Sequence, residues 1–320
     1  MSIATRLFDA DGDDRKVDLE ESLVKRLTDR QLLWVDVAGE DEADLRSIAE
    51  LFSLDRQSVR NLRDPIGPRV DHLDDYFEVT VVALAEDERA IPMDFLAGKN
   101  WVVTIHHEEV DFLAEFREQL AGNTELGRIE APSFLATLLD WQLGTYFESV
   151  NQLEETVDLL DERALRSGDR ADRAVLLNEM VQLRHRIGRI RRTLAPQREV
   201  FAALARPSFE ILAASDSAAH FRALQDRVER AIGAIENARE LLLGSFDLYM
   251  TQTAQRTNDV MRILTIVNVV LLPAVVLAGV MGMNFKVGLF ENANLFWVVI
   301  AAMVAIAVAS IAVARWRRWL

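Results

Sequence analysis

Up to about residue 130, the spacing of apolar residues changes from one segment to the next. Runs rich in β-branched and aromatic residues, at 32–37, 76–84 and 101–106, predict strands. Apolar residues at helical spacing, over 41–52 and 111–120, predict helices. We therefore expect an N-terminal domain of the α/β or α+β class.

Beyond Pro132 the pattern is helical, and we predict no further strand. Long helices are expected over 133–165 and 170–205. Pro196 should interrupt the second of these, because proline lacks the N–H group that a helix interior needs.

From residue 217 onward, apolar or small residues recur in alternating steps of four and three, which is typical of a coiled-coil seam. The seam consists of Leu224, Val228, Ala231, Ile235, Ala238, Leu242 and Ser245. A single helix over 217–284 would be on the order of 100 Å long. Such a helix must pack on copies of itself or on neighbours, so we expect a homo-oligomer.

The C-terminal region carries two long stretches without a charged residue, 263–285 and 295–314. As a helix, the first stretch would reach about 34 Å, whereas the hydrocarbon core of a bilayer is about 30 Å thick. We therefore predict two transmembrane helices, joined by an outer loop over 286–294. A buried helical hairpin in a soluble protein is the alternative.

Arginines lie outside both predicted spans, with Arg256 and Arg262 before the first and three more after the second. The positive-inside rule places both of these ends in the cytoplasm. Residues 1–16 show no signal-peptide pattern. The expected parts are a cytoplasmic α/β domain (1–131), a cytoplasmic helical stalk (132–255) and a transmembrane pore domain (256–320).

Charge and composition exclude several classes of function. The chain has 36 basic and 51 acidic residues, and 30 of the basic and 49 of the acidic ones precede residue 256. An acidic body lacks the clustered Lys and Arg of a nucleic-acid binder. The absence of cysteine excludes disulfides and thiolate chemistry. Because no phosphate-binding glycine loop or catalytic motif occurs, we expect no enzyme, no ATP-driven pump and no organic cofactor.

One face of the helix that enters the first span carries a stripe that is polar at first and apolar later. The stripe consists of Asp247, Thr251, Ala254, Asn258, Met261, Leu264 or Thr265, Asn268, Leu272, Val275 and Gly279. A polar side chain that faces lipid is costly, so Thr265 and Asn268 should face protein or water. Two interpretations remain open: hydrogen bonds within an inert bundle, or a pore lined by symmetry-related copies of this helix.

The same segment resembles the CorA family of magnesium transporters. The resemblance rests on the run 257–265, on Leu272-Pro273 and on the triplet Gly282-Met283-Asn284, which is followed by a second span and a basic tail. Upstream segments that also resemble the family are 34–37, 69–84 and 100–106. The likeness therefore covers most of the chain.

This resemblance implies a funnel-shaped homopentamer in the plasma membrane of a bacterium or archaeon. A cytoplasmic α/β domain and long stalk helices would continue into five pore-lining helices. Gly282, Met283 and Asn284 would form the selectivity filter. Mg²⁺ dehydrates reluctantly, so a ring of Asn284 carboxamides could select it through its water shell. Mg²⁺ is then the expected substrate, with Co²⁺ and Ni²⁺ also carried.

Residue-by-residue matching to the family places further positions on the pore. They are Asp247, Asn258, Met261, Leu264, Asn268 and Leu272, and the stripe itself adds Thr265. Met261, Leu264 and Leu272 would form a hydrophobic constriction that gates by dewetting. Asp247 and Asn258 would join Asn284 as cation contacts. An inside-negative potential of 100 mV would drive a dication inward with about 4.6 kcal/mol, so passive uptake is expected.

The chain departs from the family pattern at two places. Lys286 lies near the expected outer mouth, where five copies would repel dications. Ala223 stands where the family has an acid that senses cytoplasmic Mg²⁺. The candidates that remain for a regulatory Mg²⁺ site are Glu86, Asp87 and Asp226, with Glu229 as an alternative to Asp226.

Two other functions stay open. One is a proton-coupled zinc transporter of the same superfamily, and the other is a membrane-anchored coiled-coil sensor or scaffold that conducts nothing. The polar stripe argues against the scaffold, because such a protein has no need of carboxamides inside a span.

Two charged segments have simpler interpretations. Acids at alternate positions over 9–13 imitate a calcium loop, but Asp14 replaces its glycine, so we expect an acidic, mobile terminus. Five arginines over 184–192 are expected to pair with acids over 148–161 on the preceding helix.

Overall fold

A computed structural model describes the chain over 2–12, 14–39, 42–63, 67–120, 130–166, 170–206, 217–282 and 293–316. The chain divides into two compact units, Met1–Ser245 and Phe246–Leu320.

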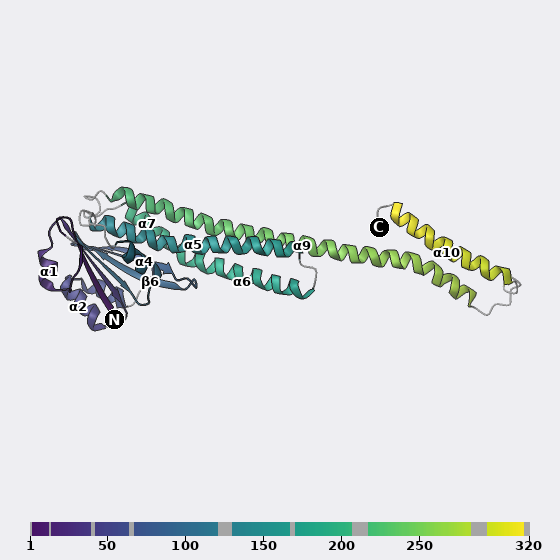
Figure 1. The fold of residues 1–320 in the computed structure, drawn as a ribbon, viewed down its shortest axis with the longest axis horizontal. Helices are drawn as coiled ribbons and strands as arrows, with labels where there is room; N and C mark the ends of the chain where they lie inside the picture. Colours follow the sequence, from purple (N-terminus) through teal and green to yellow (C-terminus); the bar gives the residue numbers. More distant parts are fainter. Residues whose placement is uncertain are drawn as a thin grey trace. The chain divides into compact units, whose positions relative to one another are not determined.

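A seven-stranded sheet forms the N-terminal part of the first unit, with the strand order β2-β1-β3-β7-β6-β5-β4 (Figure 1). The strands are β1 (Ser2–Asp9), β2 (Arg15–Lys16), β3 (Gln31–Ala38), β4 (Arg69–His72), β5 (Phe77–Leu84), β6 (Ala90–Ala97) and β7 (Trp101–His106). Only the pair of β3 and β7 is parallel among these described strands. The predicted mixture of strands and helices is confirmed.

Short helices accompany the sheet, and long helices follow it. The short ones are α1 (Glu21–Arg26), α2 (Glu42–Leu51), α3 (Arg56–Arg63) and α4 (Asp111–Gln119). The later ones are α5 (Ala131–Arg166), α6 (Arg170–Leu194), α7 (Gln197–Ala205), α9 (Ala218–Met281) and α10 (Ala293–Trp316). The expected interruption at Pro196 is confirmed, because a turn there separates α6 from α7.

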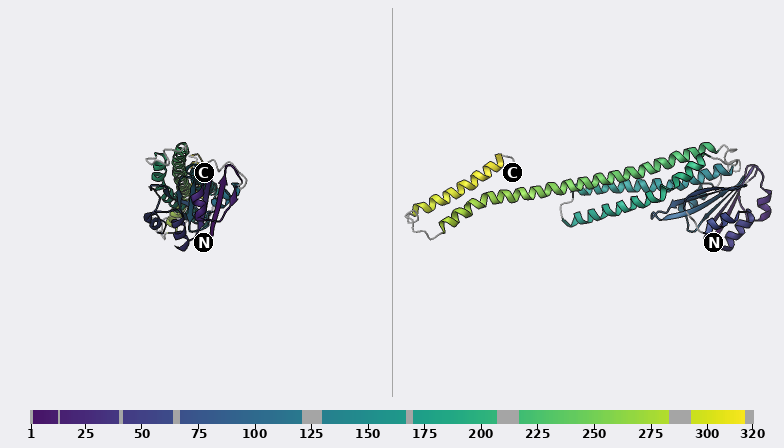
Figure 2. Two further views of the ribbon diagram at one scale, coloured as in Figure 1. Left: turned by 90° about the vertical axis from the view of Figure 1, so that its left-hand side faces the viewer. Right: turned by 180° about the vertical axis from the view of Figure 1, so that it is seen from behind.

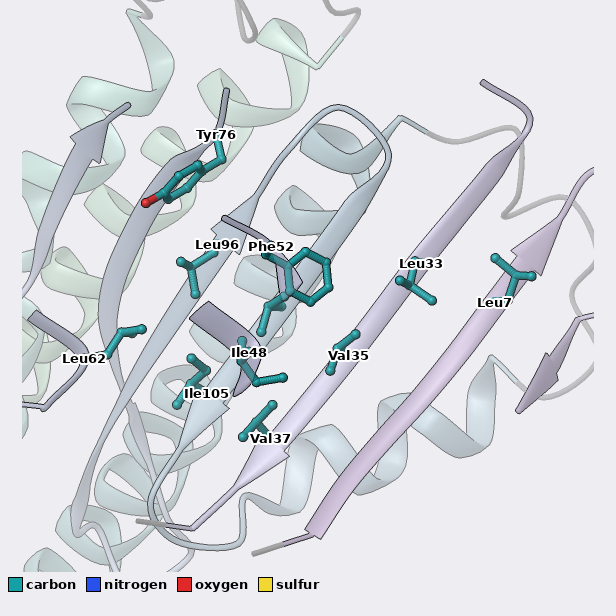
Figure 3. Packing of buried hydrophobic residues seen from close by; sticks show 11 residues of the cluster. Leu7, Leu33, Val35, Val37, Ile48, Phe52, Leu62, Tyr76, Leu96 and Ile105 are labelled. Carbon is teal, nitrogen blue, oxygen red and sulfur yellow. The ribbon is translucent and has the colours of Figure 1, made fainter. Parts of the chain in front are cut away.

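Both faces of the sheet are covered, which explains why β3 is apolar at nearly every position. On one face, Val35 and Val37 of β3 pack with Ile48 of α2 and Leu62 of α3 (Figure 3). On the other face, the ring of Trp34 meets the rings of Phe116 from α4 and Phe134 from α5, with centroids 5.6 Å apart in each pair. A strand that is buried on both sides lacks the polar alternation of a surface strand.

The expectation of a mobile N-terminus is wrong. Residues from Ser2 to Asp9 form β1, which pairs with β3 along its whole length. Leu7 and Phe8 are buried in the core. Asp11, one of the acids of the calcium-like pattern, instead makes an ion pair of 2.6 Å with Arg30. The acids that follow Phe8 hid this short apolar segment.

The seam on α9 is buried within a single chain. All seven of its residues have exposed fractions of 3% or less. Arg227 of α9 pairs with Asp140 of α5 at 2.8 Å, and Arg198 of α7 pairs with Glu229 of α9 at 2.5 Å. The chain's own helices thus occupy the seam, which gives no reason for a second copy. The homo-oligomer remains a prediction.

Side chains of α5 and α7 complete the hydrogen bonding of β5. The pairing of β4 with β5 stops at Thr80, so the backbone of Val82 has no strand partner on that side. The Oε1 of Gln197 accepts the N–H of Val82 at 3.3 Å. The carbonyl of Val82 accepts bonds from Gln142 (2.5 Å), Tyr146 (2.7 Å) and Gln197 (3.1 Å). Because all three side chains are buried, this network fixes both helices to the sheet.

A second buried polar group lies on β4, β5 and β6. Arg69 bonds to Glu78, which is fully buried, and lies 3.9 Å from Asp94. The hydroxyl of Thr80 donates to Asp94 at 2.5 Å. Burial and the nearby charge of Glu78 raise the pKa of Asp94 to about 6. One arginine therefore serves two buried carboxyl groups.

We predict that Gln197→Met lowers the stability of the protein by about 1–3 kcal/mol, because the buried N–H of Val82 loses its acceptor. Thermal unfolding of the detergent-solubilised protein, followed by tryptophan fluorescence, measures the effect. The control is Gln182→Met, on an exposed position of α6. Equal midpoints for the two variants would show that the network contributes little.

Asp94 predicts an unusual pH dependence. Its carboxyl keeps a proton up to about pH 6 in the folded protein but only to about 3.8 when unfolded, so folded stability should fall as the pH rises between these values. The loss amounts to at most about 3 kcal/mol. The variant Asp94→Asn should not show this loss. Its unfolding midpoint should therefore rise relative to that of the wild type between pH 4 and pH 7. The exposed Asp74→Asn serves as the control, and parallel curves for Asp94→Asn and the wild type would contradict the assignment.

Candidate functional site

The polar stripe lies on one continuous helix. In the second unit α9 continues as a helix to Met281, with Pro273 inside it. Every member of the stripe is exposed, from Asp247 to Gly279. The apolar members are as uncovered as the polar ones, with exposed fractions of 59% for Met261 and 64% for Leu272.

The opposite face of α9 is partly covered. Half-buried side chains recur every four residues at Arg262, Ile266, Val270 and Ala274. At 100° per residue they lie roughly 150° around the helix from the stripe. Helix α10 lies alongside this part of α9 in both views (Figures 1 and 2).

Half-buried positions also recur on α10, at Val299, Met303, Ala307 and Ser310. The half-buried face of α9 and the half-buried face of α10 lie toward each other, so α10 does not cover the stripe. The face of α9 that carries Asn258 and Asn268 is therefore exposed in the single chain.

The polar members of the stripe differ in whether the helix itself satisfies their hydrogen bonds. The hydroxyl of Thr265 donates to the carbonyl of Met261 at 2.7 Å, so the helix itself satisfies it. The side chains of Asn258 and Asn268 have no hydrogen-bond partner within the described ranges. Two carboxamides per chain therefore remain available for water or a hydrated ion. Sequence reasoning alone treated Thr265 and Asn268 as equivalent.

The apolar character of this unit suits a membrane. Within the described residues, one helix, which ends at Val280, is long and apolar enough to span a bilayer, and none of its most apolar window is buried. A shorter apolar stretch covers Trp297–Val313 of α10.

The proposed filter is described only at its first residue. The N–H of Gly282 donates to the carbonyl of Ala278 at 2.9 Å, which closes the end of the helix. A Cβ atom on Gly282 would lie 3.3 Å from the same oxygen, which is a tight contact. Met283 and Asn284 lie outside the described residues, as does Lys286. The filter therefore stays a prediction.

The three candidate regulatory acids belong to the first unit. Glu86 and Asp87 lie in the turn between β5 and β6, and Asp226 is exposed on α9. Hydrogen bonds from Arg89 hold the pKa of Asp87 below its usual value. Among the described residues, no group of three or more Asp, Glu or His side chains is placed to hold a metal ion. A single chain thus does not bring Asp226 together with the other two acids.

Glu86 instead borders a hollow that sequence reasoning missed. This acidic hollow has a volume of about 360 Å³ and is lined by three further acids, Asp111, Glu115 and Glu148. They come from α4 and α5, which are separate in the sequence. Only the four-residue step from Asp111 to Glu115, which places both on one helix face, could have signalled part of it.

A buried ion pair holds the turn that carries Glu86 and Asp87. Glu88 is 8% exposed and has a φ of 62°, a left-handed backbone that favours glycine. Arg186 of α6 donates to its carboxylate through Nη2 at 2.6 Å and through Nε at 3.1 Å. The expected pairing of this arginine with acids of α5 is therefore wrong, because Glu88 is its partner. The forked contact compensates for the strained backbone.

We predict that Glu88→Ala costs about 2 kcal/mol of stability, since it leaves Arg186 without its partner and keeps the strained backbone. The variant Glu88→Gly should cost less, because glycine relieves the strain. Unfolding midpoints measure both, with the exposed Glu86→Ala as the control. If Glu88→Ala behaved like Glu86→Ala, the pair would have no anchoring role.

Comparison with known proteins extends this description. A relative in Thermotoga maritima, the cobalt/magnesium transport protein CorA, is 24% identical over 306 residues, which cover 90% of this chain and 83% of the relative. The complete structure of the CorA magnesium transporter from Methanocaldococcus jannaschii matches with a TM-score of 0.80. That match has 21% identity and covers 100% of this chain and 99% of the other.

A further structural match is partial. The ZntB cytoplasmic domain from Vibrio parahaemolyticus has a TM-score of 0.63 and 16% identity, and the match covers 80% of this chain and 100% of that domain. The model of the family described as CorA-like Mg²⁺ transporter protein matches residues 29–315. Because this match takes in strands β3 to β7, the long helices and both apolar stretches, the chain belongs to the CorA-like Mg²⁺ transporter family.

Proposed function

We propose that this divalent-cation transporter of the CorA superfamily is a homopentameric channel for passive Mg²⁺ uptake, which also carries Co²⁺ and Ni²⁺. The observation that supports the proposal best is the uncovered stripe on α9, with its two unpaired carboxamides in the described region. A polar face directed at lipid would be costly, whereas five such faces around a wet axis are not.

The carboxamides suit a hydrated ion. Mg²⁺ keeps its first water shell, so a pore that passes it must bond to those waters. Asn268 and Asn258 would accept such bonds in sequence along the pore. Asn284, outside the described residues, would form the outer ring of the filter together with Gly282 and Met283. Asp247 would lower the energy of the dication at the inner end.

Closure would come from the apolar positions between these carboxamides. Met261, Leu264 and Leu272 expose more than half of their surface in the single chain. Five copies around a narrow axis would exclude water when the pore is closed. Rotating or separating the helices would rehydrate it.

The electrical gradient would drive uptake. With both ends of the pore domain (256–320) in the cytoplasm, ions would enter at the filter and leave past Asp247. The body would then comprise the α/β domain (1–131) and the stalk (132–255), in the plasma membrane of a bacterium or archaeon. Glu86, Asp87 and Asp226 would sense cytoplasmic Mg²⁺ only where two subunits meet, since one chain does not gather them.

Proton-coupled zinc transport is the second candidate. The likeness to the ZntB cytoplasmic domain keeps it open, whereas Lys286 near the proposed mouth would repel Zn²⁺ and Mg²⁺ alike. Uptake into liposomes separates the two. Mg²⁺ flux without a pH gradient supports the channel, whereas Zn²⁺ flux that follows a pH gradient, with no Mg²⁺ flux, overturns it.

We predict that Asn268→Leu lowers Mg²⁺ flux into liposomes more than about 10-fold, which corresponds to about 1.4 kcal/mol of lost ion stabilisation. Val270→Leu, on the partly covered face, is the matched control and should retain most of the flux. If both variants conducted like the wild type, the stripe would not line the path.

Native mass spectrometry of the detergent-solubilised complex tests the assembly. We expect a mass of roughly five times the 36.2 kDa chain. A dimer could not surround a conduit with single helices and would contradict the pentameric pore.

A further inference from the structure

A second hollow lies beside β1 in the first unit, and the transport proposal makes no use of it. Its volume is about 500 Å³, within the usual range of small-molecule pockets. Its lining comes from β1, β2, β3 and α4. The lining residues with charge are Arg6, Lys16, Arg117, Asp36 and Glu118.

Three cations from three elements meet at this basic hollow. Arg6 and Lys16 are direct partners across β1 and β2, so their side chains emerge on the same face. Arg117 lies in the last turn of α4, and its carbonyl accepts a bond from the Nη1 of Arg6 at 3.3 Å.

The positive charge is poorly neutralised. Within the described part of the chain, Arg6 and Lys16 make no ion pair. Arg117 lies 3.3 Å from Asp36, but that carboxylate also contacts the Nε2 of His106 at 3.2 Å. Glu118 is exposed and makes no ion pair among the described residues. The hollow thus has an excess of positive charge on a chain whose net charge is −15.

Such an arrangement is unfavourable unless an anion binds. Like charges directly opposite each other on paired strands destabilise a sheet. A phosphate group between Arg6 and Lys16 would reverse the sign of this interaction, because each would donate charge-assisted hydrogen bonds. Ile3, Ala4, Val17 and Trp34 also line the hollow, and all four residues are apolar. An apolar ring could pack there.

We propose that the basic hollow binds a soluble organic phosphate, with the phosphate between Arg6, Lys16 and Arg117 and the organic part against the apolar lining. No glycine-rich loop is needed, because side chains from separate elements supply the donors. That separation is also why no sequence motif indicated the site.

Isothermal titration of the full-length protein in detergent tests the proposal, with AMP as the probe because AMP binds Mg²⁺ only weakly. We expect saturable binding that Arg6→Gln and Lys16→Gln each weaken about 10-fold or more. The matched control is Arg15→Gln: Arg15 precedes Lys16 on β2 and pairs with Leu7, so it faces the other side of the sheet. Binding that Arg15→Gln weakens equally, or no binding up to millimolar AMP, would overturn the proposal.

Two further measurements separate this role from a structural one. Inorganic phosphate should bind more weakly than AMP, and equal affinities would contradict the role of the apolar lining. Without ligand, Lys16→Gln should unfold at the same temperature as the wild type or higher, since it removes a repulsion, yet it should lose the rise in midpoint that AMP gives the wild type. A lower midpoint without ligand would assign Lys16 to the fold instead.

Discussion

The backbone of Val82 must find hydrogen-bond partners where β4 ends, and the attachment of the helices to the sheet depends on how it does so. Gln142, Tyr146 and Gln197 provide those partners from α5 and α7. A buried backbone group without a partner would cost about 1–3 kcal/mol, so the helices cannot slide along the sheet without breaking several bonds. The same strand leads two residues later into the turn of Glu86 and Asp87.

The first unit and the second treat polar groups in opposite ways. In the first, buried charges are paired: Glu88 with Arg186, Asp36 with Arg117, and Glu78 with Arg69. In the second, the carboxamides of Asn258 and Asn268 are exposed and have no hydrogen-bond partner among the described residues. Carboxamides without a hydrogen-bond partner in their own chain need partners from water, an ion or another subunit. This need is why the exposed stripe of one chain supports a pore built from several copies.

Periodicity was sufficient to predict the long helices, the break at Pro196 and the strands β3, β5 and β7, because each presents a repeated pattern. It failed at β1, where a run of acids directly follows a short buried segment around Leu7 and Phe8. For the seam of α9 it left open whether copies of the chain or neighbouring helices cover the seam, since a pattern shows that a face is buried but not by which helix. The acidic and basic hollows were missed because their residues come from strands and helices far apart in the sequence.

Pro273 gives α9 a mechanical property that its continuous helix conceals. Proline has no N–H to offer the carbonyl of Val269, one turn earlier, and its ring crowds that carbonyl. The helix therefore lacks one backbone hydrogen bond immediately beyond Asn268. Sharp kinks in long helices occur at such places. Bending there would swing the segment from Ala274 to Met281 as a rigid arm while the turns below stay in place, so that a small change of angle becomes a large displacement at the tip.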